Sequence, residues 1–189
     1  MLQFPKLLLP GLIPCDNYYL MPGTAAAGAA PAIQLNYIPI WISSYCKVIE
    51  IGFNVTTLSA TNKAKVGIYE YDLKTSDPTN LLVAGAAEII FSATGYRFIT
   101  INISLDPGIY YIGYVIKDGT GQIRPMASIV DYHIPNKLLS GATFARTMGK
   151  RSLAAFVYGN EMSSIAPGPF LEFVIGNGVP NPILRVRTV

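Results

Sequence analysis

The feature that most constrains the fold of this chain is a two-residue alternation of apolar and polar side chains. In the segment 47–57, one predicted face carries Ile49, Ile51, Phe53 and Val55. The segment 96–105 repeats the pattern with the face Ile99, Ile101, Ile103 and Leu105. A period of two predicts half-buried β-strands. No long stretch follows the helical period, although Leu138–Lys150 has room for a helical turn.

Further strands are expected where β-branched and aromatic residues gather between turn signals such as Asp106-Pro107-Gly108. These segments are Ala64–Tyr71, Leu81–Ala84, Ile89–Ser92, Ile109–Lys117, Leu153–Tyr158, Phe170–Ile175 and Ile183–Val189. Many short strands without alternating helices predict an all-β domain of antiparallel strands. We expect a jelly-roll-like β-sandwich with an extended N-terminal arm.

The first 31 residues differ from the rest, and we expect an arm over 1–31 and the sandwich over 32–189. Pro5, Pro10, Pro14, Pro22 and Pro31 exclude a regular helix and the interior of a sheet. The arm is nevertheless apolar, so it needs a surface to lie on, either its own domain or a neighbouring subunit. Its candidate interface residues are Phe4, Leu7, Leu8, Leu9, Leu12, Ile13, Tyr18 and Tyr19.

Charged residues make up only 13% of the chain, against roughly 25% in an average soluble domain. The mean hydropathy is +0.37. A large core is one explanation, and extensive contact with partner subunits is the one we favour. The net charge of +3 comes from scattered basic residues, which argues against nucleic-acid binding. No run of 18 apolar residues is present, so no membrane-spanning helix is expected.

Residues that could carry chemistry are few. His133 is the one histidine in the sequence. The sequence contains no nucleophile elbow, P-loop or dinucleotide-binding motif, and no zinc or calcium signature. Cys15 and Cys46 have the wrong spacing for zinc, and a bridge between them is the alternative to two free thiols. The 11 acidic residues lie mostly in turns, and nothing selects a catalytic pair among them. We therefore expect no enzymatic activity, no cofactor and no metal.

Tyrosines are the remaining candidates for binding, and the chain has 12 of them. Tyr69 and Tyr71 would share one strand face, and Tyr110 and Tyr114 another. Three interpretations follow: packing between sheets, a subunit interface, or a ring platform that stacks against sugars.

The middle of the chain, Asn36–Pro125, resembles a β-sandwich module of tailed-bacteriophage virion proteins. That module recurs in capsid decoration (cement) proteins and in head or tail fibres. The resemblance rests on patterned strands and turns in the same order with similar spacing. They are Tyr37–Ile42, Lys47–Thr57, Val66–Asp72, Pro78–Ala86, Thr94-Gly95, Ile99–Leu105, Asp106–Val115 and Ile123–Met126.

The resemblance implies a structural virion protein, made in the host cytoplasm and incorporated into the particle. A fibre module usually follows a shaft, and no fibrous repeat precedes the strands here. We therefore expect a decoration protein on the capsid surface that binds the major capsid protein or other virion proteins at subunit junctions. Such proteins are commonly homotrimers. A fibre or receptor-binding module that binds host carbohydrate is the alternative, and a glycan- or peptide-cleaving enzyme that uses paired carboxylates or His133 is another.

Overall fold

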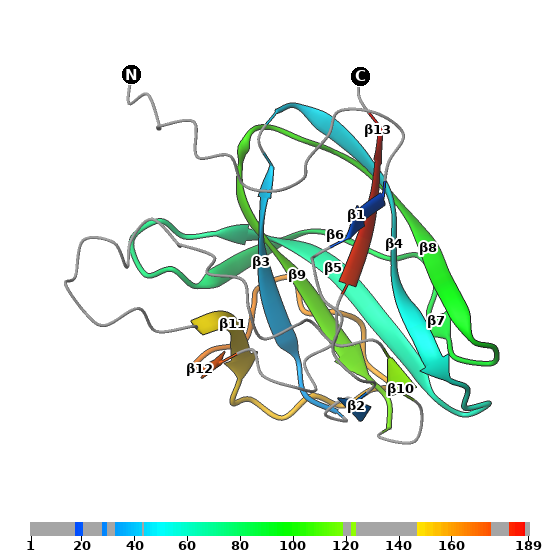
Figure 1. Cartoon of the computed structure of the whole chain (residues 1–189). Helices are drawn as coiled ribbons and strands as arrows, with labels where there is room; N and C mark the ends of the chain where they lie inside the picture. The colour runs from blue at the N-terminus through cyan, green and yellow to red at the C-terminus, as the bar shows by residue number, and fades with distance from the viewer. Residues whose placement is uncertain are drawn as a thin grey trace.

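Antiparallel strands account for all regular structure in the part of the chain that the structure describes. The computed structural model describes residues 18–20, 28–29, 33–42, 44–118, 122–123, 147–174 and 182–187. The strands within these ranges form two sheets (Figure 1). All strand pairings between them are antiparallel. The predicted all-β fold is therefore confirmed.

The first sheet has six strands in the order β1-β13-β4-β10-β2, and β8 pairs with the other side of β4. Its strands are β1 (Tyr18–Leu20), β2 (Gly28–Ala29), β4 (Cys46–Thr57), β8 (Gly95–Leu105), β10 (Gln122–Ile123) and β13 (Pro182–Arg187).

The second sheet has seven strands in the order β12-β11-β3-β9-β5-β6, and the short β7 pairs with the end of β5. Its strands are β3 (Asn36–Ile42), β5 (Lys63–Tyr71), β6 (Pro78–Ala84), β7 (Ile89–Ile90), β9 (Gly108–Ile116), β11 (Thr147–Ser152) and β12 (Phe170–Val174).

One long two-stranded ribbon connects the sheets. In the seven-stranded sheet β3 pairs with β9 as far as Ile42 opposite Gly108. Pairing resumes in the six-stranded sheet with Cys46 opposite Leu105, as β4 runs beside β8. In Figure 1 the blue and cyan strands β3 and β4 follow the green strands β9 and β8 through this change of sheet. The ribbon therefore bends over one end of the sandwich without losing its register by more than one residue.

The main core lies between the two sheets because each ribbon strand turns its apolar set inward. It combines residues of both sheets, among them Ile38, Phe53, Ile68, Ile101 and Ile112. The predicted face of segment 96–105 is confirmed, since Ile99, Ile101 and Leu105 are buried and Ile103 packs against the core.

The predicted face of segment 47–57 is wrong at its start. Val48 is fully buried, whereas Ile49 is only half-buried. The register of β4 against β8 shifts between Val48 and Glu50, and Asn102 on β8 has a φ of 49° beside this shift. Such an irregularity moves the alternation by one residue, so Val48 joins Ile51, Phe53 and Val55 on the inner face.

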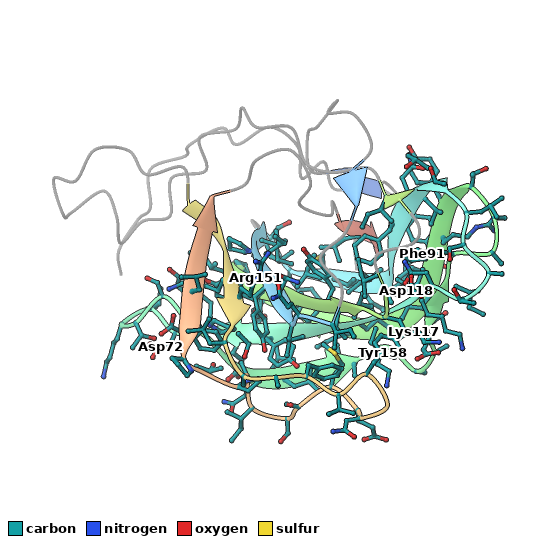
Figure 2. All side chains as sticks on the ribbon, turned by 90° about the horizontal axis from the view of Figure 1, so that it is seen from below. Asp72, Phe91, Lys117, Asp118, Arg151 and Tyr158 are labelled. Atoms are coloured by element: carbon teal, nitrogen blue, oxygen red, sulfur yellow. The ribbon has the colours of Figure 1, made fainter. Side chains whose placement is uncertain are left out.

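A second core covers the outer face of the seven-stranded sheet. Segment 153–169 connects β11 to β12 across this face, and it buries Phe156, Met162 and Ala166 against sheet residues. It reaches the free edge of β6, where Leu81 N–H donates to Ser164 O at 2.8 Å and Ala166 N–H donates to Thr79 O at 2.7 Å. The orange segment below the sheet in Figure 2 is this cover, with Tyr158 labelled on it.

Two expectations for the C-terminal third are corrected by the structure. The predicted strand Leu153–Tyr158 is irregular chain, because the hydroxyl of Ser152 bonds to Pro167 O and accepts from Ala154 N–H, which turns the chain out of β11. Within the segment 138–150, where the sequence has room for a helical turn, the described residues 147–150 belong to strand β11 (Thr147–Ser152). Residues 124–146 lie outside the described part.

The expected arm is described at two places only. Tyr18–Leu20 pairs with β13 of the same chain, with Tyr18 opposite Arg185. Gly28–Ala29 pairs with β10. Parts of segment 1–31 thus belong to the six-stranded sheet, at its ends as the prolines require. Within the described residues no helix is long and apolar enough to cross a membrane.

Candidate functional site: aromatic surfaces of the two sheets

The four tyrosines of the candidate ring platform do not lie on one surface. Tyr69 and Tyr71 belong to the outer cluster of the seven-stranded sheet, whereas Tyr110 and Tyr114 belong to the core between the sheets. Tyr69 and Tyr114 are both 0% exposed. A platform needs exposed ring faces, so these four residues do not form one. Tyr110 and Tyr114 pack between the sheets, as in the first of the three interpretations, whereas Tyr69 and Tyr71 pack on the outer face of one sheet beside Phe156 and Met162.

The outer cluster is built on edge-to-face ring contacts. The Tyr37 ring lies 5.1 Å from Tyr69 at 87° and 6.3 Å from Tyr111 at 82°. Gly113 makes this possible, because a Cβ there would come within 2.6 Å of the Tyr69 ring. The missing side chain of Gly113 leaves room for the rings of Tyr69 and Tyr37. This explains why a residue with low strand propensity stands in the middle of β9.

Hydroxyls of this cluster hold the loops that surround it. Tyr69 Oη donates to Ser163 O at 3.0 Å, and Tyr111 Oη donates to Ser76 O at 2.7 Å. Burial raises the pKa of Tyr69 above the ordinary tyrosine value, so the ring stays protonated and keeps donating at neutral pH. These tyrosines act in packing and loop anchoring.

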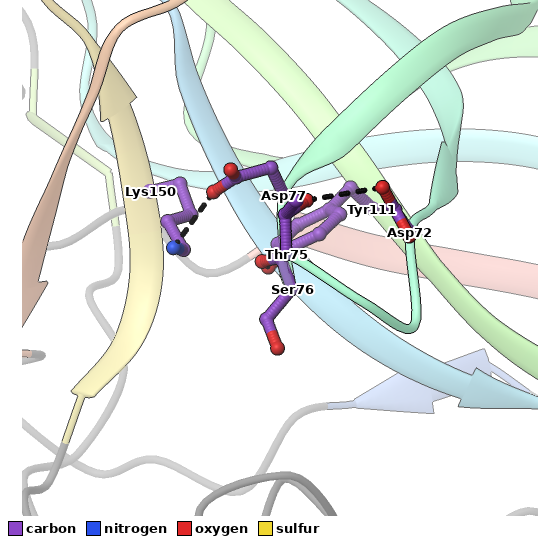
Figure 3. A network of polar contacts seen from close by, with 6 residues as sticks. All are labelled: Asp72, Thr75, Ser76, Asp77, Tyr111 and Lys150. Atoms are coloured by element: carbon purple, nitrogen blue, oxygen red, sulfur yellow. Dashed lines mark hydrogen bonds and ion pairs between the residues drawn. The ribbon is translucent and has the colours of Figure 1, made fainter.

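A polar network around the β5–β6 turn lies beside this cluster (Figure 3). Lys150 Nζ of β11 contacts Asp77 Oδ1 at 2.8 Å, with the Lys150 side chain 12% exposed. Asp72 accepts from Lys74 N–H at 2.7 Å and from Thr75 Oγ1 at 3.2 Å. The Lys74 amide in particular holds the pKa of the Asp72 carboxyl below its usual range. The network fixes the β5–β6 turn against β11.

Of the residues considered for catalysis, His133, Cys15 and Cys46, the structure describes only Cys46. His133 and Cys15 lie outside the described residues. Cys46 is a free thiol, 2% exposed, and burial raises its pKa, which keeps it in the unreactive thiol form. In the described part of the chain no three His, Cys, Asp or Glu side chains gather as a metal site.

The interface candidates Phe4, Leu7, Leu8, Leu9, Leu12 and Ile13 also lie outside the described residues, and Tyr18 and Tyr19 are placed in β1. The structure exposes other large apolar side chains that sequence reasoning missed. The most exposed ones are Leu58 (58%), Leu73 (66%), Leu153 (59%), Val157 (64%) and Ile165 (67%). They lie in connections, where no period distinguishes an exposed apolar residue from a buried one.

A different aromatic pair is present on the outer face of the six-stranded sheet. Tyr96 and Phe98 of β8 stack with ring centroids 6.2 Å apart and an angle of 22° between their planes. Tyr96 is 53% exposed and Phe98 is partly buried. Positions 96 and 98 share a strand face opposite to that of Ile99 and Ile101, which point into the core. We call Tyr96 and Phe98 the outer ring pair.

The neighbours of the outer ring pair on β4 are small or polar. Phe98 is opposite Gly52, and Tyr96 is opposite Asn54. A Cβ at Gly52 would come within 2.0 Å of the Arg97 carbonyl and 2.5 Å of the Phe98 ring, so glycine is required under this ring. Beyond the pair, Thr100 is opposite Glu50. The outer ring pair thus has an amide, a hydroxyl and a carboxylate among its neighbours on this face of the sheet.

The backbone that carries the pair is anchored from the other side. Arg97 Nε donates to Ala93 O at 3.2 Å, and its terminal nitrogen donates to Thr94 O at 3.1 Å. Gly95, the first residue of β8, has a φ of 93°, which lets the chain turn into the strand. The guanidinium therefore fixes the chain at the start of β8, next to Tyr96.

No protein-family model matches this sequence, and neither a curated protein nor a solved structure matches the chain.

Proposed function

We propose that this chain is a structural protein of a tailed-bacteriophage virion. Its role is that of a capsid decoration, or cement, protein that stabilises the shell by binding the major capsid protein at subunit junctions. Stabilisation of this kind follows mass action, because a protein that binds only the assembled state shifts the equilibrium toward assembly. The role needs no catalytic group.

The observation that carries the proposal is the order in which the strands pair. The chain pairs β1 with β13, β3 with β9, β4 with β8, and β5 with β6. Successive pairs alternate between the six-stranded and the seven-stranded sheet. The resulting sheet orders, β1-β13-β4-β8 and β3-β9-β5-β6, are what a folded antiparallel ribbon produces when it wraps into a jelly roll. We therefore propose a jelly-roll-like sandwich, an architecture typical of viral capsid and lectin domains.

Exposed apolar side chains support a role in assembly. Leu73, Leu153, Val157 and Ile165 are each more than half exposed, in a chain with only 13% charged residues. Burying such a side chain against a partner contributes on the order of 1.5–3 kcal/mol before ordering costs are subtracted. A closed homotrimer on the particle is the arrangement that we propose, since closed symmetry hides the same patch on every copy.

The test is the number of copies per purified particle. A decoration protein co-purifies with capsids in a fixed, high stoichiometry and raises the temperature at which the shells open. Few copies per particle, confined to tails, would refute the decoration role and support a fibre. Complete absence from particles would refute the virion role altogether.

A fibre or receptor-binding module is the second candidate, and the outer ring pair favours it. The Tyr96 ring is 53% exposed, and an exposed aromatic ring is suited to the apolar face of a sugar. The copy number on the particle separates the two candidates, because a receptor-binding module occurs at a few tail or fibre positions and a decoration protein covers the shell.

A further inference from the structure

The outer edge of β12 has no partner strand in the part of the chain that the structure describes. β12 (Phe170–Val174) is the first strand in the order of the seven-stranded sheet, and it pairs only with β11. In Figure 2 the salmon β12 runs beside the yellow β11, on the side away from β3. Its sequence, FLEFV, has no proline and one charged residue, Glu172. Charges, prolines or a covering segment usually protect a sheet edge, so an apolar edge like this one can accept another strand.

The hydrogen bonds beside β12 show which of its backbone groups face outward. Leu153 N–H donates to Pro169 O at 2.9 Å, so the Pro169 carbonyl faces the β11 side. Along an antiparallel strand, residues whose backbone groups face the partner alternate with residues whose groups face away. Leu171 therefore faces β11, whereas the N–H and C=O groups of Phe170 and Glu172 face the outer edge.

The bonds on β11 agree with this assignment. Ser152 lies opposite Phe170, and its N–H donates to Leu35 O at 3.0 Å, on the side of β3 rather than β12. Among the described residues, nothing bonds to the outward backbone groups of Phe170 and Glu172. The side chain between them, Leu171, is 50% exposed. The edge thus offers backbone donors and acceptors together with an uncovered apolar side chain.

We propose that residues 4–8 of a second copy of this chain add to this edge as an antiparallel strand. The inference rests on the proposed homo-oligomer and deepens it, because it names the surface that receives the N-terminal arm. It does not depend on the virion role.

Charge and proline place the arm in one register. Lys6 opposite Glu172 brings opposite charges directly across from each other, which stabilises a cross-strand pair. In this register Phe4, Lys6 and Leu8 turn their backbone groups toward β12. Pro5 then stands where an N–H would point away from β12, a position that tolerates proline. A shift by one residue would turn Pro5 toward β12 and lose a ladder bond.

The same register also places apolar residues beside apolar residues. Leu8 comes opposite Phe170, whose ring already packs edge-to-face on Tyr37 at a centroid distance of 5.7 Å. The arm thereby extends the outer cluster of the seven-stranded sheet. On the other face of the strand, Leu7 comes opposite Leu171 and covers its exposed half.

Two other occupants fit the edge less well. The register that pairs all five residues of two β12 strands places Glu172 opposite Glu172, and like charges in that position are destabilising. The arm of the same chain leads to β1, which belongs to the other sheet and lies apart from β12 in Figure 1. An arm passed to the next copy, whose own arm passes on in turn, closes a ring that fills the same edge on every copy.

Disulfide trapping in the purified full-length protein tests the register. Leu7 and Leu171 would form a non-hydrogen-bonded pair with Cα atoms about 4.5 Å apart, which is within the range of a disulfide. Leu7→Cys/Leu171→Cys in a Cys15→Ser/Cys46→Ala background is expected to give linked dimers and trimers on mild oxidation. Lys6→Cys/Leu171→Cys in the same background is the matched control. It is expected to stay unlinked, because neighbouring strand positions point to opposite faces.

A charge exchange is the second measurement, made by light scattering without any cysteine variant. Lys6→Glu and Glu172→Lys are each expected to weaken self-association several-fold, because each places like charges opposite each other. The double variant Lys6→Glu/Glu172→Lys is expected to restore it. Thermal unfolding of all variants is expected to match the protein from which each was made.

The contrary outcomes are distinct. No linkage in the Leu7→Cys/Leu171→Cys protein, or equal linkage in its control, would overturn the site. Linkage within single chains only would overturn the exchange and place the arm on its own domain. Linked dimers of a Glu172→Cys variant, with none from the Leu7→Cys/Leu171→Cys protein, would assign the edge to pairing of two β12 strands. All these assays are made in solution, so failure of the arm exchange is distinguishable from failure of the decoration role, which the copy number on particles decides.

Discussion

The side chain of Asn62 bonds to both backbone groups of Asp118. Asn62 Nδ2 donates to Asp118 O at 2.9 Å, and Asn62 Oδ1 accepts from Asp118 N–H at 3.2 Å. The same oxygen accepts from Lys63 N–H at 2.9 Å, and Phe91 N–H donates to the Asn62 carbonyl at 3.1 Å. The buried side chain of Asn62 thus joins the β4–β5 connection to the chain just after β9, and its backbone carbonyl adds the chain after β7. Figure 2 shows Phe91, Lys117 and Asp118 gathered at this end of the molecule, opposite Asp72.

Asn62→Ala is expected to lower the free energy of unfolding by about 2–4 kcal/mol, because it leaves buried backbone donors and an acceptor without partners. Asn62→Asp keeps the accepting oxygen but places a carboxylate against the Asp118 carbonyl, so it is expected to cost a similar amount. Urea denaturation measures both. Asn54→Ala is the control on the solvent-facing side of β4 and should change stability by less than about 0.5 kcal/mol. Equal effects at Asn62 and Asn54 would contradict the role of Asn62.

The hydroxyl of Tyr114 predicts a stabilising substitution. It is buried between the sheets and has no hydrogen-bond partner among the residues that the structure describes, and its ring contacts Phe53 edge-to-face at 5.7 Å. A buried hydroxyl that makes no bond costs about 1–3 kcal/mol. Tyr114→Phe is therefore expected to raise the thermal midpoint by a few degrees.

Tyr69→Phe is the matched comparison, because that hydroxyl does donate to Ser163 O. It is expected to lower stability by about 1 kcal/mol. Calorimetry on both variants tests the contrast in sign, and a destabilised Tyr114→Phe would mean that the hydroxyl is satisfied in solution.

Stability is expected to fall steeply above pH 10. Burial raises the pKa of Tyr37, Tyr69 and Tyr114 above the ordinary value of about 10. In the folded state these phenols keep protons that the unfolded chain has already released. Their contribution is therefore fully present below pH 10 and is lost as the pH rises toward the folded pKa values.

Each such tyrosine lowers the free energy of unfolding by about 1.4 kcal/mol per pH unit above 10. An absorbance titration of phenolate formation should show that these rings ionise only together with unfolding. In Tyr114→Phe the alkaline slope should be shallower than in the parent. Complete ionisation of all tyrosines near pH 10 in a protein that is still folded would contradict the burial of these three rings.

The sequence predicts the strands of the ribbon well because their alternation is set by burial on one face. The expected strand 96–105 differs from β8 by one residue, and its inner face is as predicted. The error at Val48 and Ile49 arises because a register shift has no signature in the apolar pattern. The strand predicted at Leu153–Tyr158 failed because a chain lying on a sheet also needs apolar residues, as Phe156 shows.

The same limit applies to the aromatic residues. Tyr69 and Tyr71 do share a face, but alternation does not tell whether a second layer covers that face. Here segment 153–169 covers it, far away in the sequence. The signal for Tyr96 was weaker, since it stands in a strand beside a turn and its neighbour Phe98 has a plain structural role. The glycine opposite Phe98 becomes informative only once the register of β4 and β8 is known.

The N-terminal segment gives the last prediction, that residues 1–17 anchor the domain to neighbouring subunits. They precede β1, whose pairing with β13 holds Tyr18–Leu20 at one end of the six-stranded sheet. An extended chain spans at most about 3.3–3.6 Å per residue, so a segment of this length reaches roughly 55–60 Å from that point. Its apolar residues, Phe4, Leu7, Leu8, Leu9, Leu12 and Ile13, are suited to burial in a partner.

Deletion of residues 1–17 should leave the thermal midpoint of the domain nearly unchanged and abolish its addition to particles. Deletion of residues 1–22 also removes β1, which leaves the β13 edge without the pairing of Tyr18 to Arg185 and Leu20 to Ile183. This longer deletion is therefore expected to lower the midpoint by several degrees. Thermal unfolding and a particle-binding assay on both truncations separate the two roles. If the shorter truncation fails to fold while the full-length monomer is stable alone, the segment belongs to the domain's own core. If it folds and still adds to particles, the anchor lies elsewhere.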